Sequence, residues 1–81
     1  MMAKIKELDV IRTLVPLEGP DVFDDTRVYQ LPVGSEGTVV FDFGKAFEVE
    51  FLVHPTTQED FRSVQITVEA AQCELVRAAS N

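Results

Sequence analysis

The segment 46–53 has the pattern that most limits what this chain can fold into. Its odd-numbered positions hold Phe or Val, whereas Glu48 and Glu50 hold even-numbered positions. A two-residue period of this kind is typical of an antiparallel strand with one face in a core and the other in water. Gly44 and Lys45 precede the segment and have the Gly-X composition of a two-residue hairpin turn. We therefore predict a half-buried antiparallel strand that follows a tight hairpin.

Further strands are expected on both sides of this hairpin. Their segments are rich in β-branched and aromatic residues and are separated by Gly, Pro and polar residues. Gly34 and Gly37 are expected to bracket a tight turn, and the segment 16–32 is expected to be a long irregular loop packed on the body. The predicted elements are strands over residues 8–15, 38–43, 46–53, 61–68 and 74–77, a short strand near 27–31, and one helical or 3-10 turn over 69–73.

The order of these elements indicates a small, mainly β domain. Strand, long loop, hairpin, strand, helical turn and short strand is the order of a five-stranded SH3-like barrel. Closure into a barrel would also remove the exposed edge strands of an open sheet. An OB-like barrel and a small open sheet are the alternatives, and the lack of a long helical segment counts against the former. We expect one domain over residues 1–81, with a core formed by Val39, Phe41, Val49, Phe51, Val64 and Ile66.

Three runs of the sequence resemble a family of short bacterial proteins. They are IKELDVI at 5–11, LPVGSEGTVV at 31–40 and KAFEVEF at 45–51. The family has the pattern "IKELDVV…G..GTVV…YEVEF", is frequent in cyanobacteria and is grouped as a domain of unknown function. The resemblance is weaker over 16–28 and 54–61. It implies an SH3-like fold, supplies no catalytic residue, and implies a partner encoded by a neighbouring gene, as in a toxin and its antidote.

The charge balance bears on which partners this chain can bind. Fourteen acidic residues against seven basic ones give a net charge of −7, and the basic residues are scattered along the chain. Such a surface repels phosphate groups, so we expect no binding to nucleic acids or membranes. The alternative is an accessory β-domain that binds nucleic acid through the Gly34–Gly37 turn, which is similar to the glycine turn of KOW-type modules. With no secretory signal and a single cysteine, Cys73, we expect a cytoplasmic protein.

The residues that could carry catalysis or bind a metal do not form a recognisable pattern. Glu48 and Glu50 are expected to be ordinary solvent-facing positions of a half-buried strand. His54 and Cys73 are the only residues of their kinds, so a closed zinc site cannot be assembled from them. We expect Cys73 to be a small core residue. The chain is therefore predicted not to be an enzyme and to need no cofactor or metal.

An acidic and aromatic segment in the predicted long loop is the candidate binding site. Loops on a rigid scaffold often carry binding residues, and aromatic side chains are frequent interface anchors. We therefore expect a non-enzymatic protein-interaction module with a protein partner of unknown identity. In the alternative interpretation, the aromatic residues only hold the loop on the core. The predicted partner-binding residues are Asp21, Phe23, Asp24, Asp25 and Tyr29.

Overall fold

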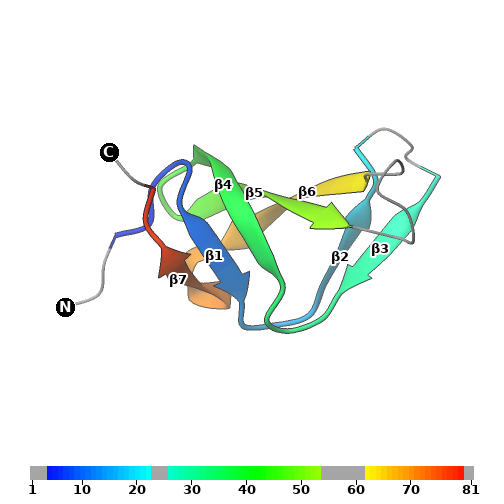
Figure 1. Ribbon diagram of the computed structural model, residues 1–81, viewed down its shortest axis with the longest axis horizontal. Coiled ribbons are helices and arrows are strands. Elements are labelled where there is room, and N and C mark those ends of the chain that lie inside the picture. The colour runs from blue at the N-terminus through cyan, green and yellow to red at the C-terminus, as the bar shows by residue number, and fades with distance from the viewer. Residues whose placement is uncertain (1–3, 23–25, 54–61, 80–81) are drawn as a thin grey trace.

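The computed structural model describes residues 4–22, 26–53 and 62–79, which form β-strands and one short helical turn (Figure 1). Five strands form an antiparallel sheet in the order β6-β5-β4-β1-β7, and β2 pairs with β3 in a separate hairpin. The predicted mainly β domain with one 3-10 turn is therefore confirmed. The elements are β1 (Val10–Thr13), β2 (Leu17–Pro20), β3 (Val28–Leu31), β4 (Glu36–Asp42), β5 (Ala46–Val53), β6 (Arg62–Glu69), the 3-10 turn η1 (Ala70–Gln72) and β7 (Cys73–Arg77).

The segment 16–32 was predicted as a long irregular loop with a short strand near 27–31; the short strand is found as β3, but the irregular loop is wrong, because β2 pairs with β3 in a hairpin. Its two strands pair from Leu17 opposite Leu31 to Pro20 opposite Val28. The Gly19-Pro20 sequence hides the strand, because both residue types usually interrupt strands. Here Gly19 is required by packing, since a Cβ atom at this position would lie 2.8 Å from Cγ1 of Ile66. The hairpin therefore approaches β6 too closely for a larger residue.

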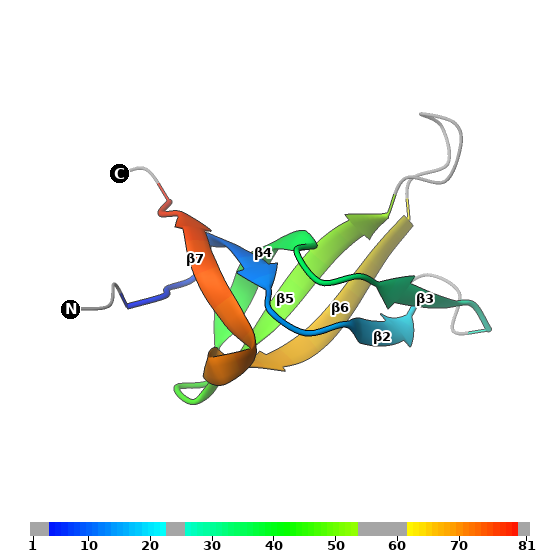
Figure 2. The same cartoon turned by 90° about the horizontal axis from the view of Figure 1, so that it is seen from below.

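The same hairpin meets the edge of the sheet at β6 (Figure 2). Asp21 forms an isolated bridge with Val64, and the Val22 N–H donates to the Ser63 carbonyl at 2.8 Å. These contacts cover the beginning of an edge strand that would otherwise present unpaired backbone groups. Among the described residues, no ladder joins β6 to β7, so the sheet is not closed by backbone hydrogen bonds.

The core lies on one face of β5 and its neighbours, largely as predicted. Val39, Val49, Phe51 and Val64 are buried, and Ile66 is half-buried. The placement of Phe41 in the core is wrong, because its side chain is 50% exposed. The described core cluster comprises Ile11, Leu31, Val39, Phe47, Val49, Phe51, Val68 and Cys73.

A β-bulge in β4 explains the exposure of Phe41. Val39 pairs with Val49, but the next paired residue on β4 is Phe41, opposite Glu48. Val40 is therefore an extra residue without a counterpart on β5. Because successive side chains alternate between faces, this extra residue moves Phe41 from the core face to the outer face, beside Glu48.

The two glycines near the start of β4 have different roles. Gly34 lies in the turn before the strand with φ of +90°, a conformation that favours glycine. Gly37 is not at the other end of this turn, as predicted, but is a buried residue inside β4. A Cβ atom there would lie 2.7 Å from both Cδ1 of Phe51 and Cγ1 of Val49. Gly37 therefore lets the core side chains of β5 pack directly against the β4 backbone.

Candidate functional site

The outer face of β4 and β5 carries a pair of exposed phenylalanines. Phe41 and Phe43 are 50% and 58% exposed, and their ring centroids lie 4.8 Å apart with an interplanar angle of 56°. This tilted arrangement is favourable for aromatic pairs. Beside them, Glu48 lies opposite Phe41 on β5, and Thr67 lies opposite Glu48 on β6. We call Phe41, Phe43, Glu48 and Thr67 the aromatic face.

Local sequence features hold the two rings in place. The bulge at Val40 turns Phe41 outward. Phe43 precedes the β4–β5 turn, and its N–H donates to the Ala46 carbonyl at 2.9 Å. Gly44 in this turn has φ of +98°, and its N–H donates to Oδ1 of Asp42 at 2.7 Å. The turn is thus fixed by backbone and side-chain hydrogen bonds, so Phe43 is presented by an ordered element.

The carboxylate of the aromatic face is oriented by a neighbour. The Thr67 hydroxyl donates to Oε1 of Glu48 at 2.9 Å, across a pair of residues that face each other on β5 and β6. This bond fixes one carboxylate oxygen. In the described part of the chain, Arg12 forms an ion pair with Glu74 at 2.9 Å, and none involves Glu48. Glu48 therefore brings negative charge to the side of the exposed rings.

The residues predicted to bind a partner are only partly described. Phe23, Asp24 and Asp25 lie outside the described residues. Asp21 is buried at the end of β2, where its N–H donates to the Arg27 carbonyl at 2.9 Å. Its side chain is therefore not presented to solvent. The docking role of this segment as a whole stays a prediction.

Tyr29 belongs to the same hairpin as Asp21 but has a different environment. It lies in β3 opposite Gly19 and is half-buried. Its hydroxyl oxygen is buried and has no hydrogen-bond partner among the described residues. The ring is therefore partly enclosed by the domain, in keeping with the alternative in which Tyr29 holds the hairpin on the core.

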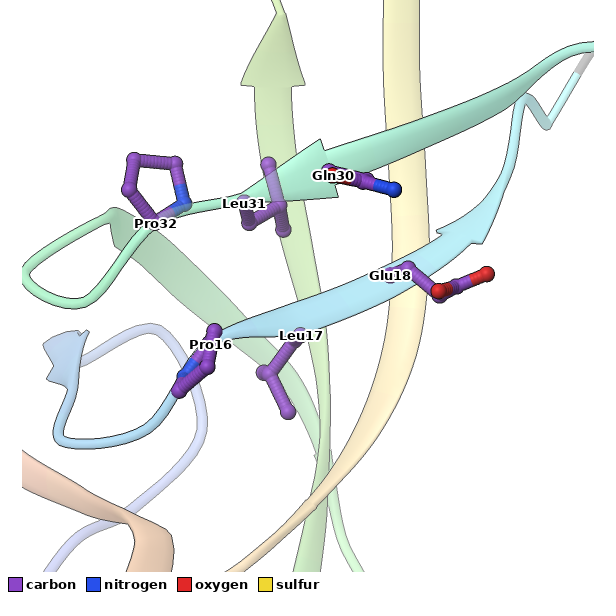
Figure 3. A pocket seen from close by; sticks show the side chains of 6 residues that line it. All are labelled: Pro16, Leu17, Glu18, Gln30, Leu31 and Pro32. Carbon is purple, nitrogen blue, oxygen red and sulfur yellow. The ribbon is translucent and has the colours of Figure 1, made fainter.

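A pocket of about 620 Å³ lies at the base of the hairpin (Figure 3). Leu17 and Leu31 lie across from each other in its wall, and Leu31 also belongs to the core cluster. Glu18 is the one ionisable side chain in the lining, which otherwise consists of Pro16, Leu17, Gln30, Leu31 and Pro32. The lining therefore holds no nucleophile paired with an adjacent general base.

A second pocket of about 540 Å³ lies at the end of the sheet near η1 and includes the single cysteine. Cys73 is buried, as expected, and its thiol donates weakly to the carbonyl oxygens of Glu69 and Ala70. Burial raises the pKa of the Cys73 thiol above its ordinary value. A thiol with a raised pKa is protonated at neutral pH and is a poor nucleophile. His54, the single histidine of the chain, lies outside the described residues.

Over residues 4–22, 26–53 and 62–79, no group of three or more His, Cys, Asp or Glu side chains is placed to hold a metal ion. Within the same ranges, no helix has the length and apolar character needed to span a membrane.

Comparison with known proteins gives no relative: no family model, curated protein or solved structure matches this chain. The function must therefore be inferred from the site itself.

Strict alternation predicted Phe41 on the core face and so missed the aromatic face. The signal that indicates it is the adjacent pair Val39-Val40, where two apolar residues interrupt the alternation.

Proposed function

We propose that this chain is a non-catalytic protein-interaction module with an SH3-like fold, and that it binds its partner through the aromatic face. The order of elements supports the fold. The chain forms, in this order, a strand, the β2–β3 hairpin, the β4–β5 hairpin, a further strand, a 3-10 turn and a last strand. The β2–β3 hairpin packs across β6 and so covers the edge strand that closure of such a barrel would otherwise protect.

The observation that carries the binding role is the exposure of Phe41 and Phe43. Exposed apolar residues occur singly on most surfaces, but here two phenylalanines contact each other on one ordered sheet face. Phenylalanine is enriched in protein interfaces, and aromatic anchors contribute much of the binding energy there. Burial of the pair by a partner would remove a large apolar surface from water, at about 25 cal/mol per Å².

The resemblance to the bacterial family implies where a partner can be sought. It implies a protein encoded by a neighbouring gene, as in a toxin and its antidote. That product is therefore the first candidate partner, and other proteins of the same cell are the next.

The experiment compares three forms of the immobilised protein. They are the wild type, the Phe41→Ser/Phe43→Ser variant, and a control variant, Leu14→Ser/Val33→Ser, whose positions are 45% and 60% exposed away from the pair. Proteins captured from the native host are identified by mass spectrometry, produced in pure form, and titrated against each form by calorimetry. We expect the aromatic variant to lose at least about tenfold in affinity, as removal of interface anchors does, and the control to bind like the wild type. Equal affinity of the wild type and the aromatic variant would contradict the proposal.

A fourth form tests the segment predicted from the sequence. Val28 is 58% exposed on the hairpin, next to Tyr29. If Val28→Ser weakens binding while Phe41→Ser/Phe43→Ser does not, the partner docks on the hairpin and not on the aromatic face.

A further inference from the structure

On the outer face, the strands β4, β5 and β6 around Phe41 and Glu48 carry more acidic than basic residues. β4 and β5 contain no basic residue, and β6 contains one, Arg62, at its first position. The acidic residues on the same face as Phe41 are Glu36, Glu48, Glu50 and Glu69, whereas Asp42 lies opposite the buried Phe47 on the other face. On the neighbouring β1, Arg12 lies opposite Glu36 and forms an ion pair with Glu74, and Lys45 lies in the β4–β5 turn. The carboxylate of Glu48 directly beside Phe41 favours a positively charged side chain of a partner over a negatively charged one.

The sheet register places acidic side chains on the same face as the rings. Glu48 lies directly opposite Phe41, and Glu50 lies opposite Thr38, three residues before Phe41 on β4. Paired residues of neighbouring strands point to the same face of a sheet. Since Oε1 of Glu48 accepts the Thr67 hydroxyl, the carboxylate has a fixed position beside an exposed ring.

We propose that the aromatic face binds an arginine side chain of the partner protein, which rests on the proposed function. The guanidinium group stacks on the exposed ring of Phe41 or Phe43 and pairs with the carboxylate of Glu48. Arginine suits this site better than lysine for two reasons. Its planar group stacks on aromatic faces, and it pairs with carboxylates through two parallel N–H donors. Apolar residues that flank the arginine cover the remainder of the rings.

A second copy of this chain is a poorer occupant of the same face. The protein has a net charge of −7, and a symmetric contact through this face would bring the carboxylates of Glu48 and Glu50 of two copies into one interface. Like charges brought together in this way oppose association.

Three short peptides test the preference for arginine. The probes are acetylated and amidated heptapeptides with the sequences GLRLRLG, GLKLKLG and GLQLQLG, which differ only in the two polar residues. Each is titrated into the ¹⁵N-labelled protein at low salt, and amide shifts are followed by NMR. We expect the shifts to centre on the aromatic face. The arginine peptide should bind about tenfold more tightly than the glutamine peptide and about threefold more tightly than the lysine peptide.

Conservative variants separate the contributions of the ring and the carboxylate. Phe41→Leu keeps an apolar side chain but removes the ring, and Glu48→Gln keeps the size but removes the charge. We expect each variant to bring the affinity for the arginine peptide to within about twofold of the affinity for the glutamine peptide. Glu18→Gln removes an exposed charge on the hairpin and serves as the control, with an arginine preference equal to that of the wild type.

The outcomes distinguish this inference from the proposed function. Equal binding of the arginine and glutamine peptides, or an arginine preference that survives Phe41→Leu and Glu48→Gln, would overturn the inference and leave the interaction module in place. Shifts centred elsewhere with all three peptides would overturn it too. A dimer seen by sedimentation in the wild type but not in Phe41→Ser/Phe43→Ser would overturn it in favour of a second copy. A different result would contradict the proposed function: a purified partner that binds the wild type and Phe41→Ser/Phe43→Ser with equal affinity.

Discussion

The carboxylate of Asp9 accepts the backbone N–H of Ala79 at 2.7 Å, across 70 residues of sequence. Its other oxygen accepts the backbone N–H of Lys6 at 2.8 Å, and the side chain is only 4% exposed. One buried side chain therefore joins the segment before β1 to the segment after β7. The buried acceptor is satisfied by two donors, which is the usual state of buried polar groups.

Replacement of Asp9 should destabilise the domain. In Asp9→Asn, one acceptor oxygen becomes an NH₂ donor that faces a backbone donor, so a hydrogen bond to a charged acceptor is lost. We expect the free energy of unfolding to fall by about 1–3 kcal/mol, measured by urea denaturation. Glu7→Gln is the control, since Glu7 is exposed, and it should change stability by less than about 0.5 kcal/mol. Equal stability of Asp9→Asn and the wild type would show that the two hydrogen bonds of the Asp9 carboxylate do not stabilise the domain.

Gly37→Ala tests the close packing of β4 on β5. The added Cβ atom would lie 2.7 Å from Cδ1 of Phe51 and 2.9 Å from the Glu50 carbonyl oxygen. The backbone oxygen cannot move aside alone, so we expect a loss of about 1–3 kcal/mol from overpacking. Gly34→Asn is the comparison, because the space there is open and asparagine tolerates positive φ. A Gly37→Ala variant as stable as Gly34→Asn would mean that the strands separate without cost.

Two phenylalanines of this chain should respond differently to truncation. Phe51 is 1% exposed and Phe43 is 58% exposed. We expect Phe51→Ala to cost about 3–5 kcal/mol of stability, which can exceed the total stability of so small a domain. Phe43→Ala should cost less than about 1 kcal/mol. Thermal unfolding followed by circular dichroism would measure both, and similar losses in the two variants would disagree with the exposure of Phe43.

The buried thiol of Cys73 predicts how stability depends on pH in the alkaline range. Burial raises the pKa of Cys73 in the folded protein above its ordinary value of 9.0. At pH values above 9.0, the thiol of the unfolded chain ionises while that of the folded chain stays protonated. The unfolded state is thereby favoured, and the free energy of unfolding falls as pH rises. When urea denaturation is measured from pH 8 to pH 10.5, the free energy of unfolding should fall less for Cys73→Ala than for the wild type. Parallel plots of this free energy against pH for the two proteins would exclude a contribution from the Cys73 thiol.

The parts of the fold that follow strict patterns could be predicted from the sequence. β5 was predicted at Ala46–Val53, the range that the structure has, because its alternation is uninterrupted. The 3-10 turn fell within the predicted segment 69–73. β2 was missed because Gly19 and Pro20 usually interrupt strands, whereas here Gly19 is needed for the close approach to Ile66 of β6, a contact between distant parts of the chain.

The candidate site was harder to predict, because it depends on one unpaired residue. A bulge changes the face of every later side chain in its strand, and neither composition nor local propensity states where it lies. Counting from Val39 in steps of two places Phe41 in the core, whereas the β4–β5 register places it beside Glu48. The face of Phe41 therefore follows from strand pairing and not from the local sequence.

The bulge at Val40 should leave a mark in a saturation mutagenesis profile of β4. In a regular strand, tolerance to substitution rises and falls with a period of two residues. Here Gly37 and Val39 are buried, whereas Val40 and Phe41 are both exposed neighbours in sequence. The profile should therefore change phase at this point, with two tolerant positions side by side. Such a phase change would locate the unpaired residue from growth or folding scores alone, without coordinates.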